Sequence, residues 1–359
     1  MRILLLGEYS GLFNCLKDGL KQLGHDVVIA SDGDGYKNYP SDYSWRVNYE
    51  GRLGAYVSLL KALKLLDKFR GFDIVHVISP LVMTYKANFG PFLFSYLKKY
   101  NGAVFLSGAG MTAQVYQYWL SQPDSKYYKY VLGYIDEVNG RSDKIPFTSS
   151  RRLKSEFEIL SLVDGYIPIM HEYSVPFHGH PKLLKTIPIP INISKYLYTP
   201  NNVGEKILFF HGITKKCKGG EFIIQAFEEL RDKYKNEAEF IVAGGMPFSE
   251  YIQYLQTVNV ILDDTNAYSL GMNSLFSMAQ GRIVMGGAEP HANKELGYIN
   301  CPAINLYSDV DYIKNEIEKI ILNRSTLLKL GEESRKFVEE HHDYIEISKK
   351  YLKAWGYND

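Results

Sequence analysis

The sequence predicts an α/β protein made of two doubly wound, Rossmann-like domains in series. Three observations support this fold class. Short apolar runs alternate with amphipathic segments of helical period. The alternation stops at 198–204 and then restarts. The length of 359 residues is also that of two ordinary domains.

The first thirty residues show the pattern that predicts the first sheet. An apolar run, 2–6, ends at Gly7, and leucines then recur at helical spacing as far as Gly24. A second apolar run occupies 27–30. This strand–loop–helix–strand order is typical of the start of a parallel, doubly wound sheet.

The remainder of the first half continues this alternation. The apolar runs predict strands at 74–78, 103–106, 165–170 and 185–193, and the helical periods predict helices at 56–69, 92–100 and 152–162. Residues 121–150 are polar and tyrosine-rich, with no clean period. We therefore expect a long loop with short helices there, a feature that is often functional inside a compact domain.

The segment 198–204 is the best candidate for a linker, because it contains proline, glycine and two asparagines. The second half then repeats the strand and helix pattern. It predicts strands at 206–210, 239–243, 260–262, 283–285 and 303–306, and helices at 222–234, 273–280, 310–322, 325–340 and 345–355. The predicted domains are 1–197 and 205–340, followed by a terminal segment, 341–359.

Composition excludes several classes of protein. Lys plus Arg is 41 and Asp plus Glu is 40, so the net charge of +1 argues against a protein that coats nucleic acid. Cys15, Cys217 and Cys301 are far apart, which argues against a disulfide framework or a zinc cluster. The sequence has no signal-peptide pattern and no apolar stretch of about 18 residues. We therefore expect a cytoplasmic protein.

Ligands of parallel sheets bind at the carboxyl ends of strands, so the loops that follow the strands are the candidate sites. The first of these, 7–11, has a glycine at each end and contains Glu8. Gly7 and Gly11 allow backbone N–H groups to approach a ligand, but the dinucleotide fingerprint GxGxxG is absent. A tight structural turn explains these glycines equally well.

The second loop, 210–220, contains three lysines and three glycines between a strand and a helix. Lysines, flexible backbone donors and a helix start together favour a diphosphate site over a solvated basic turn.

The third loop, 263–274, also joins a strand to a helix. Gly271 allows the chain to bend, and the N–H groups that follow it are the unpaired first turn of the helix. Asp263 and Asp264 could bind a divalent cation, but two adjacent aspartates are more often an acidic turn, so we expect no metal site.

With these loops, the chain resembles the GT-B glycosyltransferases, in particular the retaining family 4. Three elements carry the resemblance. Residues 210–212 followed by 218–220 are similar to the family's strand–Gly–Arg–x4–Lys–Gly–helix element, 241–247 to its glycine-rich strand end, and 268–281 to its Glu-Gly-Phe-Gly-x4-Glu-Ala-Met-Ala-x-Gly signature.

The sequence departs from this pattern at several positions. Tyr268 and Phe276 stand where the family has its two glutamates, which contact the donor sugar and the ribose. Ile213 replaces the phosphate-binding arginine, so Lys215 or Lys216 would supply that charge, whereas Lys218 matches the family lysine. In the first half, 107–112 keeps only the glycine of the family's His-Gly-x-Asp-like loop.

The resemblance implies two domains facing a cleft, with 341–359 packing back on the first domain. It implies a metal-independent enzyme without a cofactor that moves a sugar from a nucleoside-diphosphate sugar to a glycan or polyprenyl-linked lipid acceptor, with retention, in bacterial surface polysaccharide or glycoconjugate synthesis. The expected residues are Gly212, Lys215, Lys218, Gly271, Met272 and Asn273 for the donor, and Glu8, Gly11 and Gly110 for the acceptor. The catalytic group is unknown, and Tyr268 and Asp264 are the candidates.

Three alternatives stay open. The chain could be a binding or scaffold protein that lost the chemistry, because both acidic positions are changed, or another two-domain enzyme such as a sugar-nucleotide epimerase. Residues 56–70 hold four basic residues and one acid beside an apolar face. That segment would either cover the sheet or contact the inner face of the cell membrane, through an anionic lipid surface.

Overall fold

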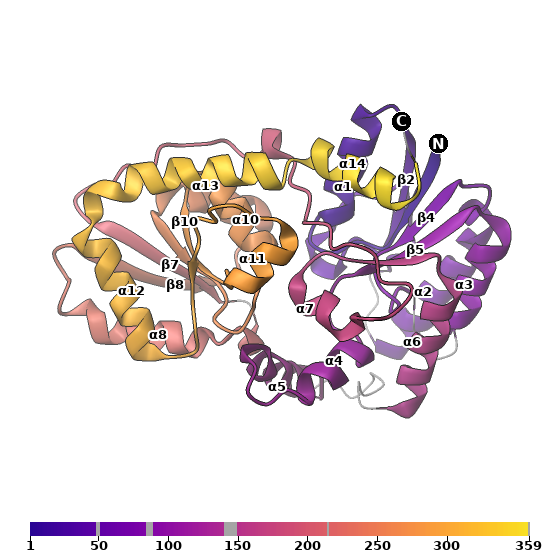
Figure 1. Cartoon of the computed structure of the whole chain (residues 1–359), viewed down its shortest axis with the longest axis horizontal. Coiled ribbons are helices and arrows are strands. Elements are labelled where there is room, and N and C mark those ends of the chain that lie inside the picture. The colour runs from indigo at the N-terminus through magenta and orange to yellow at the C-terminus, as the bar shows by residue number, and fades with distance from the viewer. Residues whose placement is uncertain (48–50, 84–88, 140–148, 214, 358–359) are drawn as a thin grey trace. The chain divides into compact units, whose positions relative to one another are not determined.

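The computed structural model describes residues 1–47, 51–83, 89–139, 149–213 and 215–357 (Figure 1). The chain forms two compact units. Unit 1 comprises Met1–Tyr118, Arg141–Asn192 and Tyr344–Asp359, and unit 2 comprises Trp119–Gly140 and Ile193–Asp343. None of the helices within the described residues is long and apolar enough to cross a bilayer.

Unit 1 contains a parallel sheet whose strand order is β3-β2-β1-β4-β5-β6. The strands are β1 (Arg2–Leu6), β2 (Asp26–Ser31), β3 (Tyr43–Ser44), β4 (Ile74–Val77), β5 (Ala103–Gly108) and β6 (Gly165–Pro168). The helices of this part of the chain are α1 (Leu12–Gln22), α2 (Gly51–Leu65), α3 (Phe89–Tyr100), α4 (Ala113–Leu120), α6 (Ser150–Leu162), α7 (His171–Ser174) and α14 (Tyr344–Ala354).

The last helix of the chain, α14, completes unit 1 by packing on α1. The two helices touch at Gly19, where an added Cβ would lie 2.3 Å from Ser348 Oγ and from the Tyr344 carbonyl oxygen. Tyr351 on the buried face of α14, and Trp355 directly after the helix, have rings 5.4 and 5.5 Å from the ring of His76 in β4. Only glycine at position 19 permits the two helices to come so close, so α1 and α14, which are far apart in the sequence, meet in one unit.

Unit 2 contains a second parallel sheet, of order β11-β10-β9-β7-β8. The strands are β7 (Ile207–Ile213), β8 (Ala238–Gly244), β9 (Val260–Leu262), β10 (Ile283–Gly286) and β11 (Ile304–Asn305). The helices are α5 (Lys126–Asn139), α8 (Gly220–Arg231), α9 (Phe248–Tyr254), α10 (Met272–Ala279), α11 (Pro290–Leu296), α12 (Val310–Leu322) and α13 (Leu327–His341), with a short 3-10 helix, η5 (Lys216–Lys218).

The two faces of the unit 2 sheet are covered by different helices. Phe209 of β7 packs in a core that includes α8 and α12, whereas the next residue, Phe210, packs towards α9. Alternate residues of a strand point to opposite faces, so an almost wholly apolar strand requires cover on both sides. Figure 1 shows α8 and α12 together on one side of this sheet and α10 and α13 on the other.

The structure corrects some sequence predictions. Residues 121–150 were expected to form a loop with short helices, but they contain the fourteen-residue α5. The expected strand at 185–193 is wrong, because Pro188 and Pro190 have no N–H to donate to a ladder; the Ile187 N–H donates to the Pro168 carbonyl of β6, but no strand forms here. The periodicity did not predict β3, α9 or α11.

Helix α5 also groups with unit 2, although the sequence placed it within the first domain, 1–197. Lys126 donates to the carbonyl oxygen of Leu306 at 2.6 Å, and Gly133 lies so close to η5 that an added Cβ would be 2.8 Å from Cys217 Cα. These partners are far away in the sequence, and local periodicity therefore carried no sign of them.

Candidate functional site

The candidate site of unit 2 lies where the strand order reverses. After β7 the chain goes to β8 on one side, and β9 and β10 then follow on the other side. The loops after β7 and β9 consequently leave the sheet from neighbouring strands. This is the point at which open parallel sheets bind ligands.

Two helices begin at this edge, and neither has a side-chain cap. Gly219 precedes α8 and Gly271 precedes α10, and as glycines neither residue provides a side chain that could cap the first turn. Met272 and Asn273 form the first turn of α10. Uncapped helix starts present backbone donors and the positive end of the helix dipole, which favour a bound anion.

Glycine is required at the start of α8. Gly219 has φ +69°, and an added Cβ would lie 2.2 Å from Thr265 Oγ1. At Gly220 a Cβ would lie 2.5 Å from Nε2 of the buried His211. The two loops are therefore in direct contact.

Lys218 forms a partly buried ion pair with Asp263. Its Nζ lies 2.7 Å from Asp263 Oδ1, and Ser274 Oγ donates to Asp263 Oδ2 at 2.9 Å. Burial alone would lower the pKa of Lys218, but the neighbouring Asp263 and Asp264 raise it above its usual range. Burial likewise opposes ionisation of Asp263, yet Lys218 holds the pKa of that carboxyl below its usual value. Both groups are charged, and each neutralises the other.

This ion pair affects which lysines could meet a diphosphate. Lys218 is already paired, whereas Lys215 and Lys216 are exposed. The Lys215 ammonium lies 5.9 Å from the centre of the Tyr134 ring of α5, and within the described residues neither exposed lysine forms an ion pair. Lys215 and Lys216 therefore supply the positive charge at this edge of the sheet that is not neutralised by an ion pair.

Asp264 and Asn266 hold the β9 loop in place. Asp264 Oδ1 accepts from the N–H groups of Asn266 and Ala267 at 2.9 and 3.0 Å. Asn266 Nδ2 donates to the carbonyl oxygen of Cys217, and Ser308 Oγ donates to Asn266 Oδ1. The sequence did not single out Ser308 or Asn266, because their partners lie more than 40 residues away.

The two aspartates bind different partners, so they do not converge on one point. Asp263 contacts Lys218 and Ser274, whereas Asp264 contacts backbone amides. Burial is the main cause that raises the pKa of Asp264 to about 7. Across the described ranges, no group of three or more His, Cys, Asp or Glu residues could hold a metal ion.

Tyr268, a catalytic candidate, lies in an aromatic cluster. Its ring stacks on Trp119 at 5.4 Å and meets His291 edge-on at 5.1 Å. The side chain is half-buried. Tyr268 therefore presents an aromatic surface at a position where the resemblance implies a carboxylate.

The remaining donor candidates lie along the same edge. Asn273 Oδ1 accepts from the hydroxyl of Tyr251, and burial raises the pKa of Tyr251. Gly212 lies near the end of β7 and pairs in register with Ala243 of β8. The bond from Tyr251 fixes the orientation of the Asn273 side chain at the start of α10.

Helix α5 supplies a second buried ion pair beside these loops. Lys126 Nζ lies 3.2 Å from Glu289 Oε1 and 3.0 Å from Asn305 Oδ1, and both charged side chains are about one-tenth exposed. Asn305 Nδ2 donates to the same Glu289 oxygen at 2.8 Å. The position of Glu289 in a strand-end loop was the sole sequence signal for this cluster.

The candidates for the acceptor lie in unit 1. Glu8 is buried and its carboxylate accepts from the N–H groups of Phe13 and Asn14, so it occupies the start of α1. Burial raises its pKa. Gly11 and Gly110 have φ +87° and +83°, and an added Cβ would meet the rings of Tyr39 and Tyr9 respectively. Gly11 permits the close packing of the Tyr39 ring, whereas at Gly110 the positive φ alone favours glycine.

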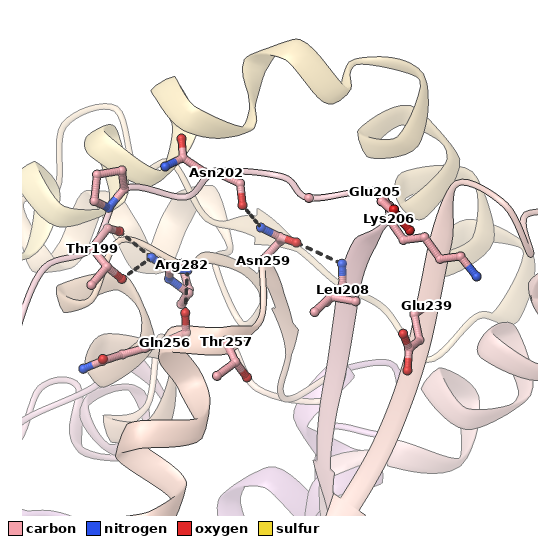
Figure 2. Close-up of a pocket in the computed structure, with 12 residues that line it drawn as sticks. Thr199, Asn202, Glu205, Lys206, Leu208, Glu239, Gln256, Thr257, Asn259 and Arg282 are labelled. Carbon is pink, nitrogen blue, oxygen red and sulfur yellow. Dashed lines mark hydrogen bonds between the residues drawn. The ribbon is translucent and has the colours of Figure 1, made fainter.

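A pocket of about 550 Å³ lies at the opposite end of the unit 2 sheet, before β7 and β9 (Figure 2). Arg282 is buried there and donates to carbonyl oxygens of Thr199, Val258 and Gln280. Burial lowers its pKa to about 10. Figure 2 shows Asn259 bridging the backbone of Asn202 and Leu208. Arg282 and Asn259 therefore bond to the backbone of Thr199 and Asn202 and hold the linker 198–204 in place.

Comparison with known proteins shows the fold of the chain. No protein-family model matches the sequence, and no curated protein matches it significantly. Sucrose-phosphate synthase from Thermosynechococcus elongatus is similar in structure, with 14% identity over 99% of this chain and 98% of the other, at a TM-score of 0.66. A glycosyltransferase from Rickettsia africae has 13% identity over 99% and 97% of the two chains, at a TM-score of 0.57.

Two further similar structures contain nucleotides. HepE from Anabaena, in complex with UDP and glucose, has 12% identity over 99% of each chain and a TM-score of 0.62. UDP-GlcNAc 2-epimerase from Neisseria meningitidis, bound to UDP-GlcNAc, has 11% identity over 98% and 99% of the two chains, at a TM-score of 0.55. The chain therefore has the α/β GT-B fold that the sequence predicted.

Proposed function

We propose that the protein is a glycosyltransferase that binds a nucleoside-diphosphate sugar at the carboxyl edge of the unit 2 sheet. One observation carries the proposal: two helices with uncapped glycine starts, α8 and α10, begin at this edge beside the exposed Lys215 and Lys216. Their amides and cations match the charge of a diphosphate. The UDP and UDP-sugar complexes among the similar structures support this ligand class.

The same groups would favour transfer over simple binding. Negative charge grows on the departing diphosphate as the glycosidic bond to it breaks. Amides and lysines fixed at that position stabilise the developing charge more than the ground state. We place Lys215, Lys216 and the N–H groups of Met272 and Asn273 in this role, with Gly212 and Gly271 as the positions that allow close approach.

Lys218 would act mainly by holding the β7 and β9 loops together. Its ion pair with Asp263 joins the β7 and β9 loops, and it would add charge to a diphosphate only while keeping that bond. We propose no single catalytic residue, because Asp264 is turned towards backbone amides and Tyr268 is packed among rings.

The acceptor is a glycan or a lipid-linked sugar, in bacterial surface polysaccharide or glycoconjugate synthesis. The reaction would keep the anomeric configuration and need no metal. These finer proposals rest on the resemblance of the loops to retaining enzymes. Product NMR would report the configuration, and activity in EDTA would report the metal requirement.

Calorimetry with UDP, UMP and a panel of nucleotide sugars tests the donor site. We expect UDP to bind more tightly than UMP, because the second phosphate adds the charge that the site recognises. Lys215→Ala with Lys216→Ala should weaken UDP binding about tenfold or more while melting at the wild-type temperature. Equal affinity for UDP and UMP, or for the variant and the wild type, would remove the diphosphate assignment.

A donor-hydrolysis and transfer assay separates an enzyme from a binding protein of the same fold. Sugar release or transfer from the tight-binding donor supports the glycosyltransferase. Binding without turnover across a broad acceptor panel would instead identify a binding protein, and interconversion of the nucleotide sugar would identify an epimerase.

A further inference from the structure

Helix α2 of unit 1 exposes four large apolar side chains to solvent. Leu53, Tyr56, Leu60 and Leu63 are 66%, 58%, 42% and 38% exposed. Their spacing of three, four and three residues places them on one stripe of the helix. We call these four residues the α2 stripe.

The opposite face of α2 buries small residues. Gly54, Ser58 and Ala62 recur every four residues and are all buried. Ser58 Oγ also donates to the buried carbonyl of Trp45 at 3.1 Å. A helix that only covers a sheet places its large apolar residues inwards. The reversed arrangement of α2 indicates that the stripe has a partner outside unit 1.

The charges around the α2 stripe identify the kind of partner. The sequence of α2 contains three basic residues and no acidic one. Lys61 and Lys64 are exposed beside Leu60 and Leu63, and Lys68 and Arg70 follow with one acid, Asp67, which pairs with Arg70. An anionic surface complements this arrangement, because lysines gain from the surface potential while the apolar side chains enter the interface.

A second copy of the chain is a poorer match. A twofold contact along the stripe would bring Lys61 and Lys64 close to the same lysines of the other copy, without an acidic partner on α2. An anionic bilayer has no such conflict.

The neighbouring helix α3 extends the apolar surface. Tyr96 of α3 donates through its hydroxyl to the Leu66 carbonyl at 3.0 Å, directly after α2. Phe92, one turn before Tyr96, is 51% exposed. Helix α2 precedes β4 and α3 follows it. Helices that connect parallel strands run opposite to the strands, so the amino ends of α2 and α3 lie at the carboxyl edge of the sheet, where the loop 7–11 also lies.

We propose that the α2 stripe and its lysines bind an anionic lipid bilayer. The role of this contact, which is to bring unit 1 to a lipid-linked acceptor, rests on the proposed glycosyl transfer. The binding itself does not.

Co-sedimentation of the full chain with vesicles tests the contact without donor or turnover. Vesicles of phosphatidylcholine alone are compared with vesicles containing about one-third phosphatidylglycerol. We expect binding only to the anionic vesicles, reduced at about 0.5 M NaCl. Failure of this test overturns the membrane contact and leaves the donor site untouched.

Two pairs of variants separate charge from apolar burial. Lys61→Glu with Lys64→Glu, and Leu60→Ser with Leu63→Ser, should each lower the vesicle partition coefficient about tenfold or more. Lys235→Glu with Lys353→Glu makes the same charge change at exposed positions elsewhere, and Leu322→Ser with Ile299→Ser removes exposed apolar side chains elsewhere. Both control variants should bind as the wild type does.

Three results would overturn the proposal. One is wild-type protein that does not sediment with anionic vesicles. Another is equal loss of binding in the control variants. The third is a dimer by analytical ultracentrifugation that Leu60→Ser with Leu63→Ser converts to monomer, since a second copy would then occupy the stripe.

Discussion

Lys218 Nζ lies 2.7 Å from Asp263 Oδ1, and this ion pair joins the two loops that leave the unit 2 sheet from β7 and β9. The carboxylate is 4% exposed and the lysine side chain 21%. A pair so shielded from water is costly to break from one side, because the remaining charge has no counterion. Lys218, which the resemblance predicts to bind the donor, thus also holds the loops together.

Removing one member of this pair should destabilise the protein more than removing both charges. Lys218→Met leaves Asp263 buried and unpaired, which should cost about 3–5 kcal/mol in the free energy of unfolding. Lys218→Met combined with Asp263→Asn should recover most of that loss. Urea unfolding of the two single variants and the double variant measures the coupling between them.

UDP binding by the same variants tests whether Lys218 also reaches the ligand. Asp263→Asn frees the lysine charge, so this variant should bind UDP more tightly than the wild type, and the double variant should bind less tightly than Asp263→Asn. Identical affinities for Asp263→Asn and the double variant would confine Lys218 to a structural role.

Docking of α5 on η5 should depend on Gly133. A Cβ there would lie 2.8 Å from Cys217 Cα, which is backbone and cannot give way as a flexible side chain would. Gly133→Ala should lower the unfolding free energy by about 1–3 kcal/mol and weaken UDP binding, because the lysines of the β7 loop move with η5. Thermal melts measure the change in stability, and calorimetry measures the change in UDP binding.

Leu132→Ala is the matched control on the same helix. Leu132 is 41% exposed, so its truncation should change the unfolding free energy by less than about 0.5 kcal/mol. Equal effects of the two alanine substitutions would contradict a specific contact at Gly133.

Stability should vary with pH through Asp264. Its pKa is raised to about 7 in the folded protein from a usual value of 3.8, so the folded state holds more protons than the unfolded state between these values. The wild type should therefore lose stability as pH rises through this window. Asp264→Asn keeps an acceptor at Oδ1 and does not ionise.

The stability of Asp264→Asn relative to the wild type should consequently increase from pH 4 to pH 8, by roughly 2–4 kcal/mol. Chemical unfolding across this range measures the difference. A constant difference between the two proteins would show that Asp264 does not titrate in this window.

His76 should make the protein sensitive to acid. Burial lowers its pKa to about 3 from a usual value of 6.5, so the unfolded chain takes up the proton first as pH falls. Between pH 7 and pH 5 this one group should remove about 2 kcal/mol of stability. His76→Gln should show a correspondingly smaller loss over that interval in urea unfolding, and an unchanged loss would assign the acid sensitivity to other groups.

Local patterns in the sequence predicted the sheets well. Apolar runs at 2–6 and 260–262 coincide with β1 and β9, and the helical period at 310–322 coincides with α12. These elements are buried along one face or on both sides. Their buried positions require apolar residues, which therefore recur at the period of a strand or a helix. The apolar pattern of 185–193 predicted a strand, but Pro188 and Pro190 cannot donate to a ladder and no strand forms there.

The site was only partly accessible from sequence. The glycines and lysines of 210–220 and the helix start at Gly271 are contiguous signals, and they do lie at one edge of one sheet. The pairing of Lys218 with Asp263 and of Lys126 with Glu289 spans 45 and 163 residues. Contacts over such distances leave no mark in a local pattern, so the sequence could not show that Lys218 is paired whereas Lys215 and Lys216 are exposed.

The packing of α14 on α1 sets the order in which the molecule can be completed during synthesis. Helix α1 is synthesised before unit 2, but the surface around Gly19 and His76 stays uncovered until Tyr344–Ala354 has been made. Unit 1, although its chain begins first, is therefore finished last. A chain cut between unit 2 and α14 would have an intact unit 2 and an open unit 1.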